Sequence, residues 1–170
     1  MNPTHLHLLL NHFPIFGSLI GMALLACGMY SKNHQVKLLG IFLLVIMALA
    51  AIPVFLTGEP AEHAVKNIAD ISKPMIEEHE EAAELAFWLM EVTGMLALIS
   101  FFLMHRQSNY AKHALAAALL FSAITFGTMA NTGYLGGQIH HSELRNNAAG
   151  TQNPQNEDGG EQDGQKDDDD

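Results

Sequence analysis

The sequence predicts an all-α fold, a four-transmembrane-helix bundle, and two observations carry that prediction. Four apolar runs are each about 18–22 residues long, which is the length that crosses a hydrocarbon core of about 30 Å as a helix. A backbone surrounded by lipid must satisfy its own hydrogen bonds, so helices are the expected form. The four runs are Phe13 to Tyr30, Leu38 to Thr57, Leu85 to Met104 and Ala114 to Leu135.

The first helix is expected to begin near Thr4, above the membrane, and to accommodate Pro14 by a kink. Because no Lys or Arg precedes the first run, we expect a retained span and not a cleavable signal peptide. Gly17 and Gly21 form a small-residue step that permits close helix packing. Cys27 is the only cysteine, which excludes an intrachain disulfide and a c-type heme attachment, and we expect it to be buried.

The second and third helices are separated by a long acidic segment in which we expect a short interfacial helix. Gly58-Glu59-Pro60 is expected to end the second helix, and residues 61–71 can then lie along the membrane surface as a helix. Pro74 would sit in the first turn of the third helix, where its missing N–H costs nothing. From Met75 to Met104 the chain can run as one helix of about 30 residues, or about 45 Å, which projects above the bilayer.

Two domains follow from the composition. Residues 1–145 form the four-helix membrane domain, which contains all four apolar runs. Residues 146–170 are rich in Asn, Gln, Gly and acids and end in four aspartates. Such a segment cannot bury a core, so we predict a disordered acidic tail.

The charges predict the orientation of the bundle. Four spans place both termini at one end, here called the terminal end, and two short loops at the opposite end, here called the tight-turn end. The tight-turn loops carry Lys32, Lys37, Arg106 and Lys112 without any Asp or Glu, whereas residues 58–84 carry two lysines against eight acids. By the positive-inside rule the tight-turn end is cytoplasmic. We therefore expect a multi-pass protein of the bacterial inner membrane with both termini in the periplasm.

Seven of the ten histidines are predicted to lie at the terminal end, within a layer about 10 Å thick. They are His5, His7, His12, His63, His79, His140 and His141. Two imidazoles from different helices at similar depth are what axial ligation of a b-type heme requires. The preferred axial ligands are His12 and His79, and His7, His63 and His140 are possible substitutes.

A metal site is the alternative interpretation of the same histidines. Imidazole also suits copper, zinc and iron, and the carboxylates of the acidic segment could complete a coordination sphere. For this site the candidates are His5, His7, His63 and His141. The histidines at the tight-turn end, His34, His105 and His113, are interpreted as residues of the membrane interface.

Glu91 is the only formal charge inside an apolar run. Carboxylates are costly within a membrane and usually face the bundle interior. We expect Glu91 either to relay a proton or to hydrogen-bond a ligand histidine. The structural alternative is a protonated side chain bonded to a neighbouring helix, through Asn131 or Thr132.

Four short stretches of the chain resemble a bacterial membrane family catalogued as domain of unknown function 2231. The resemblance covers residues 1 to about 143 and rests on His7-Leu-Leu-Leu-Asn-His12-Phe13-Pro14-Ile15, Thr57-Gly58-Glu59-Pro60-Ala61, His79 and Gly136-Gly137. It departs from the family where no proline follows His7 and where Ile139-His140-His141 replaces apolar and aromatic residues. The resemblance implies a four-helix membrane domain in which His7, His12 and His79 are recurring polar positions. It implies no reaction, but some relatives look associated with respiratory or heme proteins, which favours heme.

The leading functional prediction is therefore heme b binding and electron transfer with a quinone or a periplasmic redox protein. The alternatives are a copper-, iron- or zinc-binding membrane protein and a non-catalytic subunit that docks a periplasmic partner, and a homo-oligomer is compatible with each. No Ser-His-Asp arrangement, Cys-His pair or His-Glu-x-x-His motif indicates a hydrolase. A net charge of −10 disfavours nucleic-acid binding.

Overall fold

The structure, a computed structural model, describes residue 7 and residues 9–65 and 73–140, without the side chains of 59–65, 139 and 140. Its helices are α2 (His12–Tyr30), α3 (His34–Val65), α4 (Lys73–His105) and α5 (Ala111–His140). No strand occurs among the residues described, which confirms the all-α prediction. The acidic tail predicted at 146–170 lies outside them.

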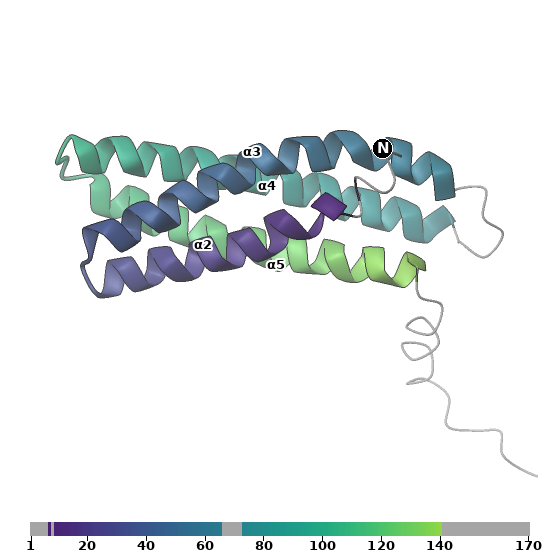
Figure 1. The fold of residues 1–170 in the computed structure, drawn as a ribbon, viewed down its shortest axis with the longest axis horizontal. Helices are drawn as coiled ribbons and strands as arrows, with labels where there is room; N and C mark the ends of the chain where they lie inside the picture. Colours follow the sequence, from purple (N-terminus) through teal and green to yellow (C-terminus); the bar gives the residue numbers. More distant parts are fainter. Residues whose placement is uncertain (1–6, 8, 66–72, 141–170) are drawn as a thin grey trace, which may run out of the picture.

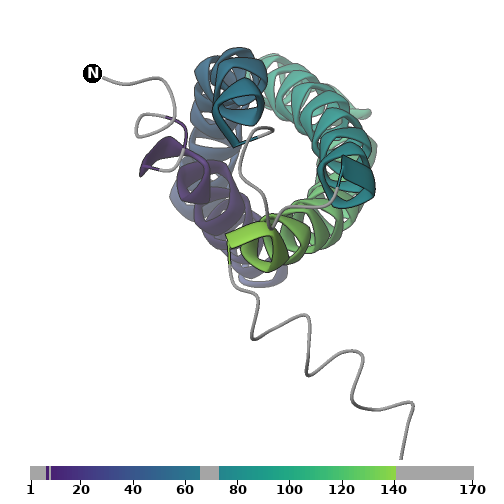
Figure 2. The same ribbon diagram turned by 90° about the vertical axis from the view of Figure 1, so that its right-hand side faces the viewer.

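The four helices run antiparallel along one long axis (Figure 1). Each helix packs on two neighbours, in the closed order α2, α3, α4, α5 and back to α2, as the end-on view in Figure 2 shows. Tight turns at residues 31–33 and 106–110 join helices at one end, and Lys32 and Gln107 take positive φ values there, as residues after a helix often do. The two tight turns therefore lie at one end of the bundle, and the start of α2 and the end of α5 lie at the other, as predicted.

The distribution of side chains is that of a bundle surrounded by lipid. All four helices are long and apolar enough to cross a membrane. Large apolar side chains such as Phe42, Leu49 and Trp88 are more than half exposed, whereas Thr93 and Thr125 are fully buried. In water this arrangement would be unfavourable, because apolar surface would be solvated while polar groups were buried. The chain is thus a multi-pass membrane protein.

Helices α2 and α3 approach each other through glycine. A Cβ atom built on Gly40 would lie 2.6 Å from the backbone nitrogen of Leu25, and one on Gly21 would lie 2.9 Å from the Leu44 side chain. Side chains at these positions would push the two backbones apart. The close packing predicted for the Gly17 and Gly21 step is therefore confirmed, with Gly40 supplying the facing surface.

The second helix is longer than predicted. We expected it to end at Gly58-Glu59-Pro60, but α3 continues through this sequence to Val65, so residues 61–65 are not part of a separate interfacial helix. A proline removes one intrahelical hydrogen bond, and near the membrane surface water can satisfy the carbonyl that is left, so the helix can continue. The rest of the expected interfacial helix, residues 66–71, lies outside the described residues.

Of the remaining predictions, the long third helix is confirmed, whereas the burial of Cys27 is wrong. Helix α4 begins at Lys73 and runs unbroken to His105, which confirms the long third helix with Pro74 in its first turn. Pro14 lies in the first turn of α2 and is buried, so no kink is needed to accommodate it. Cys27, expected to be buried, is exposed, because it lies off the buried stripe of α2 that contains Leu25 and Gly28.

Candidate functional site

His7 lies one turn before α2 and ties the start of the chain to α3. The Asn11 backbone N–H donates to the His7 carbonyl at 2.9 Å, which gives this segment one helical turn. The His7 Nδ1 atom lies 3.0 Å from the Val54 carbonyl oxygen and 3.4 Å from the Thr57 Oγ1 atom. Because a carbonyl can only accept, the Nδ1 atom carries the proton in this bond.

The surroundings of His7 favour its neutral form. Burial lowers the pKa of His7 from its ordinary value, and the bond to the Val54 carbonyl opposes this to a smaller extent. With the proton on Nδ1, the neutral ring has its lone pair on Nε2, the form in which imidazole binds a metal. The environment of His7 therefore suits a ligand nitrogen.

His79 makes the corresponding contact between α4 and α5. Its Nδ1 atom lies 3.1 Å from the Thr132 carbonyl oxygen, so Nδ1 carries the proton here as well. A Cβ atom built on Gly136 would lie only 3.0 Å from the His79 Cε1 atom. The imidazole of His79 thus occupies space that glycine leaves on α5.

The two histidines follow one pattern. Both Nδ1 atoms lie against a carbonyl of another segment, but the glycines differ, because a Cβ atom on Gly58 would lie 3.7 Å from the His7 Cε1 atom, which is an ordinary contact. The structure pairs His7 with the Thr57-Gly58 motif and His79 with the double-glycine motif. Sequence reasoning identified all these residues but not their pairing. A glycine directly after an apolar run, Gly58 after Thr57 and Gly136 after Leu135, was the signal that could have suggested it.

The preferred pair from the sequence, His12 and His79, is placed on different surfaces. His12 is exposed, and its ring stacks on the ring of Phe16 with centroids 6.5 Å apart. Phe16 lies four residues further along α2 and is 60% exposed, so both rings lie on the outer face of the helix. His79, by contrast, is half-buried between α4 and α5.

Four other candidates cannot be placed as side chains. His63 lies in α3 and His140 ends α5, but their side chains lie outside the description, as do His5 and His141 entirely. Among the described side chains, no group of three or more His, Cys, Asp or Glu could hold a metal ion. The alternative metal site on His5, His7, His63 and His141 stays a prediction.

Within the part of the chain that the structure describes, two buried side-chain oxygens, one each on Glu91 and Asn11, have no hydrogen-bond partner. The Glu91 Oε1 atom is one of them, so the bond expected to Asn131 or Thr132 does not satisfy it. The Thr132 hydroxyl instead donates to the carbonyl of Thr128 in its own helix, and Asn131 is exposed. The other is the Asn11 Oδ1 atom, one turn after His7, which sequence reasoning did not single out.

Fold and site together define a multi-pass four-helix membrane protein with two anchored histidines at its terminal end. No family model matches the chain, and no curated protein or solved structure matches it. Membership of the family catalogued as domain of unknown function 2231 therefore stays a prediction from the motifs quoted above.

Proposed function

We propose that the protein binds a b-type heme at its terminal end and transfers electrons, with His7 and His79 as axial ligands. The observation that carries this proposal is the shared geometry of the two imidazoles. The Nδ1 atoms of both rings donate to a backbone carbonyl, that of Val54 or Thr132, so both neutral rings are held in the tautomer with the lone pair on Nε2. A hydrogen bond of this kind fixes the tautomer and orientation of a ligand histidine and raises its basicity.

The two histidines each lie beside a glycine of a neighbouring helix, His7 beside Gly58 and His79 beside Gly136. Asn11, one turn from His7, has a buried Oδ1 atom without a hydrogen-bond partner among the described residues. His7 replaces His12 as the partner of His79, because the His12 ring lies on the outer face of α2.

A heme held there would accept and release one electron at a time. The proposed exchange partners are a membrane quinone and a periplasmic redox protein, which the terminal end would meet if it faces the periplasm. Glu91 is the residue proposed to move a proton with the electron, since its Oε1 atom is buried without a partner in an apolar span.

The test is an absorption spectrum of detergent-purified full-length protein, oxidised and then reduced with dithionite, with quantification of the pyridine hemochrome. We expect a Soret band that shifts on reduction and sharp reduced bands. His7→Ala and His79→Ala should each abolish or convert this spectrum, because one axial ligand is removed. His105→Ala is the matched control, since His105 is exposed at the tight-turn end and only stacks on Phe101.

The outcomes separate the candidate ligands. A featureless spectrum after expression with ample heme would overturn the proposal. A spectrum lost in His12→Ala but retained in His7→Ala would restore the pair predicted from the sequence. Metal analysis of a colourless sample would then test the copper, iron or zinc alternative.

A second candidate is a non-catalytic subunit that docks a periplasmic partner. The hydrogen bonds of His7 and His79 favour it if their role is structural. Through these bonds, His7 ties the start of the chain to α3 and His79 ties α4 to α5, which is a structural role. In that case the purified protein is colourless, and His7→Ala or His79→Ala lowers its unfolding temperature. A partner that co-purifies with the unaltered protein is lost from these variants.

A further inference from the structure

An open pocket lies at the tight-turn end, opposite the histidine site. Its volume is about 510 Å³, within the range of small-molecule sites. It lies where α3 and α5 begin and α4 ends. Its lining residues are His34, Lys37, Met104, Ser108, Asn109, Ala111, Lys112 and Leu115.

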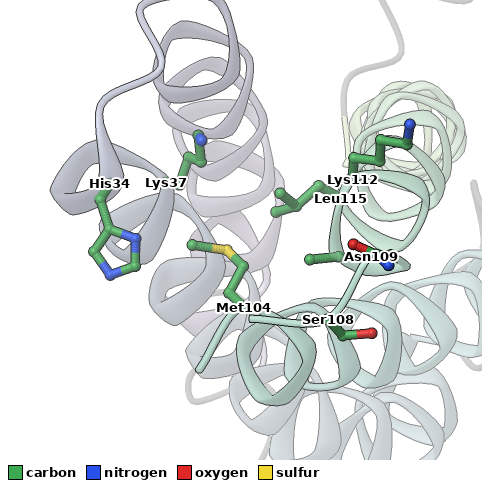
Figure 3. A pocket seen from close by; sticks show the side chains of 8 residues that line it. His34, Lys37, Met104, Ser108, Asn109, Lys112 and Leu115 are labelled. Carbon is green, nitrogen blue, oxygen red and sulfur yellow. The ribbon is translucent and has the colours of Figure 1, made fainter. Parts of the chain in front are cut away.

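The pocket combines a basic rim with an apolar floor. Figure 3 shows His34 and Lys37 on one side and Asn109 and Lys112 on the other, with Met104 and Leu115 between them. No Asp or Glu occurs in residues 31–37 or 105–113, so no carboxylate of these turns competes for the lysines. Such a pocket suits an anionic group joined to an apolar body.

The position of Lys37 is fixed by packing. A Cβ atom built on Gly28 would lie 2.5 Å from the Lys37 backbone nitrogen and 2.9 Å from its Cγ atom. The first turn of α3 therefore lies directly against α2, with the stem of Lys37 over Gly28. In addition, the Asn33 side-chain oxygen accepts from the Gln35 and Val36 N–H groups at 3.0 and 3.2 Å, which caps this helix start.

The pocket lies at the depth of lipid headgroups. Tyr30 and Tyr110, at the ends of the neighbouring turns, are 93% and 72% exposed. Tyrosines concentrate at membrane–water interfaces, where their rings meet the headgroups. We therefore expect the phosphate groups of the surrounding leaflet to lie near the level of Lys37 and Lys112.

We propose that this pocket binds a phosphate group and that an anionic phospholipid of the surrounding leaflet supplies it. The lysines and Asn109 would hold the phosphate, and Met104 and Leu115 would contact the glycerol and upper acyl chain. Basic pockets between transmembrane helices bind anionic headgroups in this way. The site is separate from the histidine site, and its occupancy does not depend on heme.

The test is native mass spectrometry of the full-length protein in detergent, titrated with phosphatidylglycerol, phosphatidylcholine or inorganic phosphate. We expect phosphatidylglycerol to bind more tightly than phosphatidylcholine. Lys112→Gln should weaken phosphatidylglycerol binding about fivefold, and Lys37→Gln/Lys112→Gln more than about tenfold. Lys112 is exposed at its helix start, so its replacement does not disturb the packing.

The matched control is Lys32→Gln/Arg106→Gln, which removes the same charge from the same end at exposed residues outside the pocket. Phosphatidylglycerol binding by the control should equal that of the unaltered protein. Equal losses in both double variants would overturn the proposal, because they would indicate a general surface charge effect. Displacement of phosphatidylglycerol by inorganic phosphate at equal concentration would assign the site to free phosphate and overturn the lipid assignment.

Discussion

At the scale of single residues, the terminal end is built from imidazoles fitted against glycines. A buried polar group is costly unless it is hydrogen-bonded, so His7 and His79 are retained there through Nδ1 bonds to carbonyls. Those bonds require the ring to lie close to the neighbouring helix, and only a residue without a Cβ atom leaves that space at position 136. The histidine and its glycine are therefore one structural unit.

Gly136→Ala should accordingly disturb His79. The new Cβ atom would lie 3.0 Å from Cε1 and 3.4 Å from Nδ1 of the ring, which forces a shift and weakens the bond to Thr132. Gly137→Ala is the control, because a Cβ atom there meets nothing within 4 Å and the gain in helix propensity is the same. We expect Gly136→Ala to be less stable than Gly137→Ala by about 1–3 kcal/mol in denaturant titrations of detergent-solubilised protein.

A double-mutant cycle with His79→Ala isolates the cause. Without the imidazole there is nothing for the new methyl group to displace, so Gly136→Ala should then behave like Gly137→Ala. If the difference between the alanine variants persists in the His79→Ala background, the close approach is not what makes glycine necessary at 136.

At the scale of the helices, α4 and α5 are joined by buried hydroxyl groups. The Thr93 and Thr125 Oγ1 atoms lie 2.8 Å apart, and the Thr125 hydroxyl also lies 3.1 Å from the Leu89 carbonyl oxygen of α4. Ser100 and Ser122 are buried as well, each with its hydroxyl bonded to a carbonyl of its own helix. Small hydroxyl residues satisfy their own polarity and still allow two helices to pack closely.

Replacing Thr93 tests the contribution of the hydroxyl pair. Thr93→Val keeps the branched shape and removes the bond between the two hydroxyls while leaving the Thr125 contact to the Leu89 carbonyl, so we expect a loss of about 0.6–1.7 kcal/mol in unfolding free energy. Thr128→Val is the control, because the Thr128 hydroxyl donates to the Thr125 carbonyl within its own helix. Equal losses for the two variants would show that the bond between α4 and α5 adds nothing beyond the intrahelical bonds.

The sequence predicts such elements well and their contacts poorly, for a physical reason. Whether a segment crosses a membrane depends on its length and composition, so all four spans could be located from the apolar runs. Which face of a helix meets a neighbour depends on rotations that no single segment determines. His12 was therefore preferred over His7 on depth alone, although their side chains lie on different surfaces. The end of α3 was misplaced because a Gly-Glu-Pro sequence usually breaks a helix in water.

At the scale of the whole molecule, the two ends differ in charge and in the chemistry proposed for them. The described acids Glu77, Glu78, Glu80, Glu81 and Glu84 are exposed on the first turns of α4, at the terminal end. At the opposite end, Lys37 and Lys112 line the pocket proposed to bind phosphate, and Lys32 and Arg106 are exposed outside it. This separation places the electron-transfer proposal and the lipid proposal on opposite faces of the membrane.

The orientation itself can be measured with reporter fusions in a bacterial host. Because basic loops are retained in the cytoplasm, alkaline phosphatase fused after residue 145 should be active, and green fluorescent protein fused there should be dark. Fusions of the same reporters after Ser108, within the tight turn 106–110, should give the reverse result and serve as the internal control. The opposite pattern at both positions would place the histidines in the cytoplasm. A periplasmic redox protein could then not reach them, and the phosphate pocket would face the periplasmic leaflet.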